Sequence, residues 1–313
     1  MNEKGIILLW VLIIAFIFSL LFIGLYPKLH LWGTIANKVY GEPFIDWGFY
    51  SSIEYAKKLL IESAYFKFNN PNQLWAKNDL VYKFSEDYGF KITITDEDGK
   101  FPLNNLFSGD FINPIDERSK KIFERLIKIA RFPYQLNELP KLWAERINIY
   151  QIKPHLITFE EFISFSPVEY KHIFNEEYLP LSNFVTVYSS GKININTIRK
   201  EVFLALSDSI REQNFTTLQT IINNGQENGI KNLEELSHYS EFESFYNEIK
   251  EYLTTESIFF VVESEVFWRS EEVKKRFLLK KTSYDGKIKF DKIGELPVYM
   301  YSGLPDIENI KYE

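Results

Sequence analysis

The sequence contains no cysteine among its 313 residues. This absence excludes disulfides, thiolate nucleophiles and cysteine-ligated metals. It leaves the cellular compartment open, because exported proteins can also lack cysteine. Histidine is scarce as well, with four widely separated residues: His30, His155, His172 and His238. A histidine-rich zinc site is therefore not expected.

The sequence patterns of common enzyme sites are also missing. No phosphate-binding loop of the form G-x-x-x-x-G-K-[ST] occurs, and Ser189 lacks the flanking glycines of a nucleophile elbow. Adjacent carboxylates such as Glu234 and Glu235 would point in different directions on a helix, as expected of a solvated face. No enzymatic activity is predicted.

Positive charge is in deficit, because 36 Lys and Arg residues face 43 Asp and Glu residues, a formal net charge of −7. The acidic excess argues against binding of a nucleic-acid phosphate backbone as the main role. Apolar residues make up 45% of the chain and aromatic residues 17%. This is enough material for a packed interior, so a disordered chain is not expected.

The longest apolar run extends from Ile6 to Leu25, 20 residues without a charge. As a helix it would be about 30 Å long, the thickness of the hydrocarbon core of a bilayer. A cleaved secretion signal has a shorter apolar region and a small-x-small cleavage site, whereas this run ends in the sequence LYPK. We therefore expect a retained membrane helix. Lys4 on one side and Lys28 on the other leave its orientation open.

Hydrophobic periodicity predicts the order of the remaining elements. Strands are expected at residues 80–84, 90–95, 184–188, 257–268, 275–282 and 287–293. Helices are expected at 44–68, in a block at 113–178 with Thr158 and Ser166 as N-caps, and between the strand at 184–188 and residue 253. This order predicts an antiparallel sheet that is interrupted by a helical insertion.

Three stretches resemble one protein family, and their order agrees with it across nearly the whole chain. Gly5 before the apolar run resembles a type IV prepilin cleavage site, at which a peptidase cuts after glycine and methylates the new terminus, here Ile6. The stretch DEDGKFPLNNL (Asp96–Leu106) resembles a strand–turn segment of the minor pseudopilin K of type II secretion systems, general secretion pathway protein K. The stretch VTVYSSGKININTIRKEVFLALS (Val185–Ser207) resembles the most recognisable motif of that family.

The resemblance implies an α+β fold in which an N-terminal transmembrane, pilin-like helix packs on a small antiparallel sheet. A large insertion of SAM-like or helix-hairpin-helix-like kind is expected within it. The implied segments are a prepilin leader (1–5), a transmembrane helix (6–26), the pseudopilin helix with the first strands (27–103), the helical insertion (104–183), a short strand with a helix-hairpin-helix-like region (184–253) and the closing strands (254–313).

Trp10 stands where most pilins and pseudopilins have glutamate, because it is the fifth residue after Gly5. In those proteins the carboxylate is thought to pair with the amino terminus of the neighbouring subunit nearer the tip. An unpaired carboxylate in hydrocarbon costs several kcal/mol, so a subunit without a tipward neighbour favours an apolar residue there. The resemblance therefore implies that Trp10 marks a tip subunit, since the family lacks this glutamate.

The sequence also departs from the family. The stretch LPKLWAERINIY keeps Trp143 but lacks the two aspartates that flank the tryptophan in the family. Ile198 stands after Asn-Thr, where the family usually has alanine. These departures put in doubt a metal-binding role of the loop after Trp143, but not the overall resemblance.

The predicted helix start Asn194-Ile195-Asn196-Thr197 also resembles that of a helix-hairpin-helix module. Many such modules bind DNA phosphates through a glycine-rich hairpin. The connection LSDSIREQNF has no glycine, and residues 193–253 carry five basic and ten acidic residues. We therefore expect Asn194 and Asn196 to be turn and capping residues, with Asn196 or Thr197 as the N-cap of the following helix.

Asp96 and Asp98 are candidate calcium ligands, because Ca²⁺ is bound by several carboxylate and carbonyl oxygens. The sequence after them, Lys100-Phe101-Pro102, breaks the alternation of acids that an EF-hand-like loop needs. A solvated hairpin turn is the preferred interpretation of this stretch, and calcium stays open because some members of the family bind it.

The resemblance implies a minor pseudopilin at the pseudopilus tip, which initiates filament assembly for protein export across the outer membrane. Its expected partners are other minor pseudopilins, the major pseudopilin, the inner-membrane assembly platform and prepilin peptidase. The expected location is the inner membrane, with a single span and the C-terminal body in the periplasm. No nucleic-acid partner and no cofactor other than calcium are expected. The alternative is a membrane-anchored helix-hairpin-helix protein of DNA uptake or of a related type IV filament.

Overall fold

The computed structural model describes residues 3–64, 69–77, 79–107, 114–150, 156, 158–164, 179–224, 229–269, 271–284 and 287–296. The strands are β1 (Leu80–Ser85), β2 (Tyr88–Asp96), β3 (Phe101–Pro102), β4 (Val185–Thr186), β5 (Ile193–Asn194), β6 (Leu253–Thr254), β7 (Phe259–Trp268), β8 (Glu271–Tyr284) and β9 (Lys287–Leu296). The α-helices are α1 (Glu3–Ala64), α2 (Glu117–Ile129), α3 (Leu139–Tyr150), α4 (Phe159–Ile163), α5 (Lys200–Ala205), α6 (Glu212–Asn224), α7 (Ser240–Glu243) and α8 (Tyr246–Ile249). Short 3-10 helices are η1 (Leu74–Ala76), η2 (Leu103–Leu106), η3 (Tyr134–Glu138), η5 (Leu181–Asn183), η6 (Leu233–His238) and η7 (Lys250–Tyr252).

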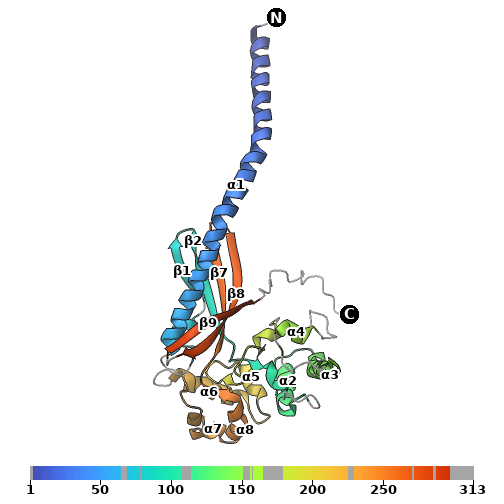
Figure 1. Ribbon diagram of the computed structural model, residues 1–313, viewed down its shortest axis with the longest axis vertical. Helices are drawn as coiled ribbons and strands as arrows, with labels where there is room; N and C mark the ends of the chain where they lie inside the picture. The colour runs from blue at the N-terminus through green and yellow to red at the C-terminus, as the bar shows by residue number, and fades with distance from the viewer. Residues whose placement is uncertain are drawn as a thin grey trace.

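The helix α1 joins the apolar run to the body of the protein. The stretches 6–26 and 44–64, expected as separate segments, belong to this one helix, which contains Pro27 and Pro43. Figure 1 shows α1 projecting from the body and bending along its length, and proline is a common cause of helix bends. Residues 65–68, the predicted end of the second stretch, lie outside the described residues.

The lower part of α1 packs on one face of a five-stranded antiparallel sheet with the order β1-β2-β7-β8-β9 (Figure 1). In β2 the buried residues alternate, and Phe90, Ile92 and Ile94 lie opposite Val266, Ser264 and Val262 of β7. All of these side chains except Ser264 form one hydrophobic core with the buried face of α1, including Phe49, Ile53, Ala56 and Leu60. Every second residue of the strands thus packs against a face of α1 on which residues recur every three to four positions.

The helical insertion occupies the chain between β2 and β7, and Figure 1 shows it at the end of the sheet away from the projecting part of α1. It has a larger core of its own, in which α2 contributes Ile122, Phe123, Leu126 and Ile127. Two short parallel strand pairs, β3 with β4 and β5 with β6, lie where the insertion begins and ends. The predicted α+β fold with an N-terminal helix, an antiparallel sheet and a helical insertion is confirmed.

Several local predictions need correction or fall outside the described residues. The N-cap of α5 is Arg199, without a side-chain hydrogen bond, so the prediction that Asn196 or Thr197 caps this helix is wrong. The predicted N-cap Thr158 is confirmed, because its Oγ1 accepts a hydrogen bond from the Glu161 N–H at 3.1 Å. Ser166 and its predicted helix lie outside the described residues. The predicted strand at 184–188 shortens to the two residues of β4.

Candidate functional site

The upper part of α1 is the most exposed apolar surface of the described chain. The segment Trp10–Gly33 has 24 residues, is long and apolar enough to cross a membrane, and buries none of its length against the rest of the protein. Trp10 itself has 62% of its surface exposed. A helix that is apolar on all sides is stable only in a bilayer or among other apolar helices. Gly5 and Ile6 belong to α1, and their side-chain surroundings lie outside the described part of the chain.

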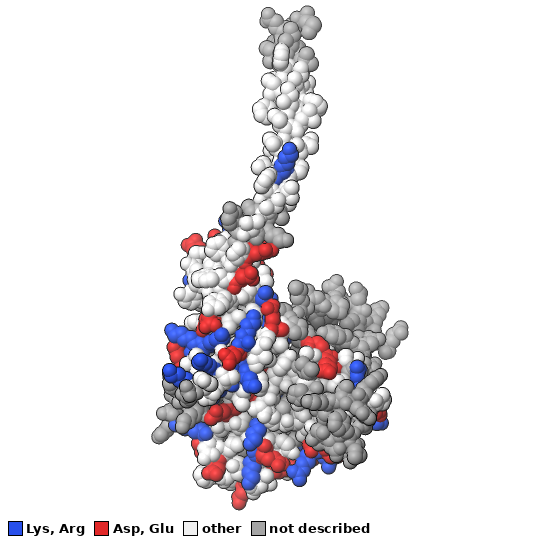
Figure 2. Space-filling model, in the orientation of Figure 1, with Lys and Arg blue, Asp and Glu red and all other residues white. Residues whose placement is uncertain are grey.

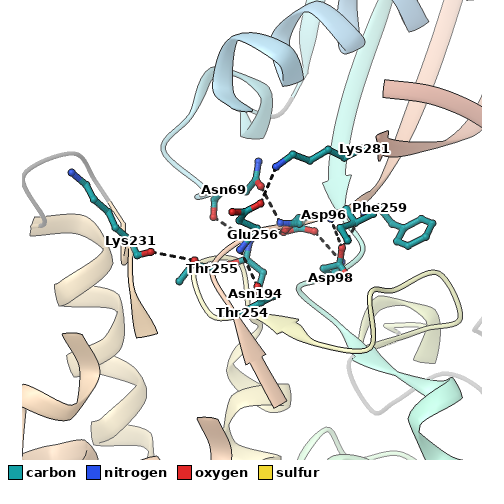
Figure 3. Close-up of polar contacts among 12 residues, drawn as sticks. Asn69, Asp96, Asp98, Asn194, Lys231, Thr254, Thr255, Glu256, Phe259 and Lys281 are labelled. Carbon is teal, nitrogen blue, oxygen red and sulfur yellow. Dashed lines mark hydrogen bonds and ion pairs between the residues drawn. The ribbon is translucent and has the colours of Figure 1, made fainter. Parts of the chain in front are cut away.

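The second conspicuous feature is a buried polar junction where the chain enters and leaves the insertion. We call the side chains of Asp96, Asp98, Asn194, Thr197 and Ser257 the junction. Asp96 ends β2, Asn194 ends β5, and Ser257 lies in the link between β6 and β7. Figure 3 shows Asn194 and Asn69 converging with Asp96, beside Asp98 and Phe259.

Asp96 is the centre of the junction. Its Oδ2 accepts hydrogen bonds from Ser257 Oγ at 2.5 Å, Thr197 Oγ1 at 2.5 Å and Asn194 Nδ2 at 3.1 Å. Its Oδ1 accepts the backbone N–H of Asp98 at 2.9 Å. Burial and then the negative charge of Asp98 raise the pKa of Asp96 to about 7, although the three side-chain hydrogen bonds lower it. A protonated Asp96 is therefore accessible near neutral pH.

Asp98 joins the insertion to the start of β7. Its Oδ2 accepts the backbone N–H groups of Ile258 at 2.6 Å and Phe259 at 3.0 Å. Its Oδ1 accepts Ser189 Oγ at 2.9 Å and the Ser190 N–H at 2.8 Å. Both ends of the insertion are thus held by one fully buried carboxylate.

The surroundings of these carboxylates correct the preferred interpretation of the stretch as a solvated turn. Asp96, Glu97 and Asp98 are all buried, and Glu97 forms a buried ion pair with Lys100 at 2.5 Å. N–H and O–H donors point at the oxygens of Asp96 and Asp98, whereas a Ca²⁺ site needs free oxygens. No cluster of three or more histidine or acidic side chains suited to a metal occurs in the part of the chain that is described. Calcium binding at Asp96 and Asp98 stays an untested prediction, and this arrangement gives it no support.

The asparagines of the motif hold backbone groups rather than a ligand. Asn194 Nδ2 donates to the Asn69 carbonyl at 3.1 Å and to Ser257 Oγ at 2.7 Å, and its Oδ1 accepts the Asn196 N–H at 3.0 Å. The Asn196 amide pairs with both backbone groups of Ile230, accepting its N–H at 2.7 Å and donating to its carbonyl at 2.9 Å. The motif therefore joins, by hydrogen bonds, loops that are far apart in sequence.

Gly99 lies so close to Thr197 of the junction that no side chain fits between them. A Cβ atom built on Gly99 would lie 2.7 Å from the Thr197 carbonyl oxygen and 2.9 Å from Thr197 Oγ1. The Asp98-Gly99 pair, predicted as a turn signal, is thus needed for close approach of two segments. Sequence reasoning missed Ser257, Ser189 and Asn69, and no local pattern marks them, because each meets its aspartate or asparagine from far along the chain.

Two basic residues of the helix pair that resembles a DNA-binding module contact other side chains of the protein. Lys200 at the start of α5 forms an ion pair with Glu212 at the start of α6, with Nζ and Oε1 2.8 Å apart. The Arg199 guanidinium lies 5.5 Å from the ring centre of Phe184. These contacts leave the acidic excess of the region as its main electrostatic feature.

The fold is similar to that of a chain in the crystal structure of the GspK–GspI–GspJ complex from the type 2 secretion system of enterotoxigenic Escherichia coli. The TM-score is 0.58 at 15% sequence identity, and the match covers 84% of this chain and 98% of that chain. At this identity the similarity shows a shared fold. No protein-family model matches the sequence, and no curated protein matches it.

Proposed function

We propose that this chain is a minor pseudopilin of a type II secretion system, which lies at the pseudopilus tip and initiates the filament that exports proteins across the outer membrane. The observation that carries the proposal is α1. One helix, Glu3–Ala64, has a fully exposed apolar part and a lower part packed on an antiparallel sheet. The fold shared with a chain of the GspK–GspI–GspJ complex supports it.

Such a helix moves from one apolar environment, the membrane, to another, the filament, while the body of the protein stays folded. In the inner membrane the segment Trp10–Gly33 is covered by lipid, and in a filament it is covered by the helices of neighbouring subunits. The proposed partners are therefore other minor pseudopilins and the major pseudopilin, together with the assembly platform and the peptidase that cuts after Gly5. The body lies in the periplasm in this account.

The tip position rests on Trp10. An apolar and exposed side chain at residue 10 needs no charged partner, whereas a carboxylate would need a tipward amino terminus to pair with. The junction and the two cores give the chain a structural role, and we propose no catalytic one.

Co-purification tests the proposal. The full chain, carrying an affinity tag, is purified in mild detergent from its native membranes after brief chemical cross-linking. We expect stoichiometric recovery of other proteins with an N-terminal apolar helix and a pilin-like body, which a tagged unrelated single-span protein should not recover. Recovery of none of them would contradict the proposal. Retention of the same purified chain on DNA at low salt would support the DNA-uptake alternative instead.

A further inference from the structure

The insertion and the part of the protein that consists of α1 and the five-stranded sheet have separate hydrophobic cores. The core of the insertion and the core between α1 and the sheet share no residue. In the described part of the chain, no helix or strand of the insertion packs extensively against α1 or against the sheet. The position of the insertion relative to the sheet therefore depends on the places where the chain passes between them, rather than on shared apolar burial.

A polar crevice of about 310 Å³ lies between the sheet and the insertion. The sheet lines it with charged side chains that include Lys91, Glu263 and Arg276, and η5 of the insertion lines it with Ser182 and Asn183. Figure 2 shows basic and acidic side chains next to one another around β8 and β9, whose places Figure 1 gives. Charged groups at a wet surface gain little from being pressed together. The crevice therefore does little to hold the insertion in place.

Both passages of the chain between the sheet and the insertion lie at the junction. The first passage follows Asp96 at the end of β2, and the second precedes Phe259 at the start of β7. Asp98 holds the second passage by accepting the N–H groups of Ile258 and Phe259, and Asp96 holds it by accepting the hydroxyl of Ser257. The junction, shown in Figure 3, is therefore the point about which the insertion can turn.

The junction contains two neighbouring carboxylates and no cation. The donors to Asp96 and Asp98 are hydroxyl, amide and backbone N–H groups, and no described lysine or arginine forms an ion pair with either. The loop after α1 and β5 contribute the neutral side chains of Asn69 and Asn194. The charged side chains of the adjoining segments are paired with one another: Glu97 with Lys100, and Glu256 with Lys281. Within the described chain, Asp98 is therefore the charged group that acts on Asp96 directly.

The two protonation states of Asp96 differ in charge but can keep the same hydrogen-bond partners. The hydroxyls of Thr197 and Ser257 can donate to an ionised Asp96 or accept from a protonated one. An ionised Asp96 places a second buried charge beside Asp98, and burial together with this neighbour raises the pKa of Asp96 to about 7. Exposure to water removes this cost, because water hydrates the charge.

We infer that the junction is a latch that opens as the pH rises. Protonated Asp96 keeps the insertion seated on the sheet. Ionised Asp96 is drawn into water, so the insertion turns about the two passages and the polar crevice widens. The inference does not rest on the proposed function, because two separate cores and a pair of buried carboxylates are all that it requires.

The direction of the pH dependence follows from the two values of the pKa. In the open arrangement Asp96 has its ordinary pKa of 3.8, and in the closed arrangement its pKa is about 7. Between these values the closed arrangement binds a proton that the open one has lost. The closed arrangement is thus favoured most below about pH 4 and loses this advantage as the pH rises through about 7.

Distance measurements on the full chain in detergent test the latch. Because the chain has no cysteine, introduced cysteines are the only sites that a thiol-reactive spin label modifies. Lys289→Cys with Glu241→Cys joins β9 to α7, and the control pair, Lys121→Cys with Glu241→Cys, joins α2 to α7 within the insertion. Pulsed electron spin resonance measures both distances between about pH 5 and 8.5, the range in which Asp96 loses its proton.

We expect the pair from β9 to α7 to show one distance at the lowest pH and a second distance that gains population as the pH rises. The ratio of the first population to the second should fall by about tenfold or more, while the control pair keeps one distance. A ratio that does not change with pH would overturn the inference. An equal change in the control pair would also overturn it, because the insertion would then be unfolding rather than turning.

A matched pair of variants tests whether Asp96 is the group that titrates. Asp96→Asn keeps the size of the side chain and cannot ionise, so we expect its population ratio to be independent of pH. Asp87→Asn, in the exposed turn after β1, should keep the wild-type response. A wild-type response in Asp96→Asn would rule out this latch. The wild-type measurement needs no substitution at the junction, so it decides the inference even where Asp96→Asn does not fold.

Discussion

Asn196 fixes a loop 34 residues away by pairing with both backbone groups of buried Ile230. Removing a side chain of this kind leaves two buried polar groups unsatisfied, each of which costs about 1–3 kcal/mol. This is more than the loss of an exposed helix cap, for which about 1 kcal/mol is typical. The residue therefore matters through stability rather than through a ligand.

The corresponding variant is Asn196→Ala, which we expect to lower the free energy of unfolding by about 2–4 kcal/mol. Asn232→Ala is the control, because Asn232 caps the exposed helix η6 through a capping box, and its loss should cost about 1 kcal/mol. Denaturant unfolding of the full chain in detergent measures both. An Asn196→Ala variant that unfolds like the wild type but no longer assembles would instead indicate a direct contact with a partner.

Asp96 links the stability of the junction to pH. Its pKa is about 7 in the folded chain, against the ordinary value of 3.8, because burial and Asp98 disfavour its charge. Between these two values the folded state binds a proton that the unfolded state has lost. The stabilisation is thus fully present below about pH 4 and is lost as the pH rises through about 7.

We expect Asp96→Asn to remove this component of the pH dependence, whatever its effect on absolute stability. In the wild type one such proton lowers the free energy of unfolding by up to about 1.4 kcal/mol per pH unit across this window. The measurement is denaturant unfolding between pH 4 and 8, with Asp87→Asn at an exposed turn as the control that should keep the wild-type slope. Equal slopes in wild type and Asp96→Asn would contradict the account.

At the scale of elements, the contact between α1 and β7 depends on close approach. A Cβ atom built on Gly48 would lie 2.5 Å from Cγ1 of Val266. Next to it, Ser264 Oγ donates to Ser52 Oγ at 2.7 Å, and Ser52 Oγ donates to the Phe49 carbonyl at 2.8 Å, so the buried hydroxyls are paired. Small residues on α1 therefore let the helix approach the sheet.

Gly48→Ala should lower the free energy of unfolding by about 1–3 kcal/mol, because the added methyl group pushes α1 away from Val266. Gly33→Ala in the same helix is the control, since nothing lies within 4 Å of its added Cβ atom, and alanine favours helix. Thermal unfolding of the full chain in detergent compares the two. A Gly48→Ala variant with an unchanged free energy of unfolding would contradict a contact between α1 and Val266 that is too close for a methyl group.

The positions of helices and strands can be predicted from the sequence where hydrophobic periodicity is strong. The prediction fails where contacts between residues far apart in sequence determine the structure. The alternation in residues 90–95 and 257–268 predicts β2 and β7 within a few residues. The burial of Asp96 and Asp98 could not be predicted, because their donors Ser257 and Ser190 are 161 and 92 residues away in sequence. The start of α5 was misplaced for the same reason, since Asn196 and Thr197 bond to other segments.

At the scale of the whole molecule, Trp10 bears on the proposed position of this chain at the tip of a filament. If nothing lies tipward of this chain, a carboxylate at residue 10 has no cationic partner and is costly in an apolar environment. Trp10→Glu should then give no gain in pseudopilus formation at matched expression, and should impair membrane insertion or association. Filament counts by electron microscopy measure this. A clear gain would contradict the tip position, because it requires a tipward neighbour.

We propose that this chain is a pilin-like subunit whose exposed helix begins at a processed amino terminus. The most direct test is the intact mass of the full chain purified from its native membrane. We expect a protein that lacks Met1–Gly5 and carries one methyl group on Ile6. A mass that still includes the first five residues would contradict it.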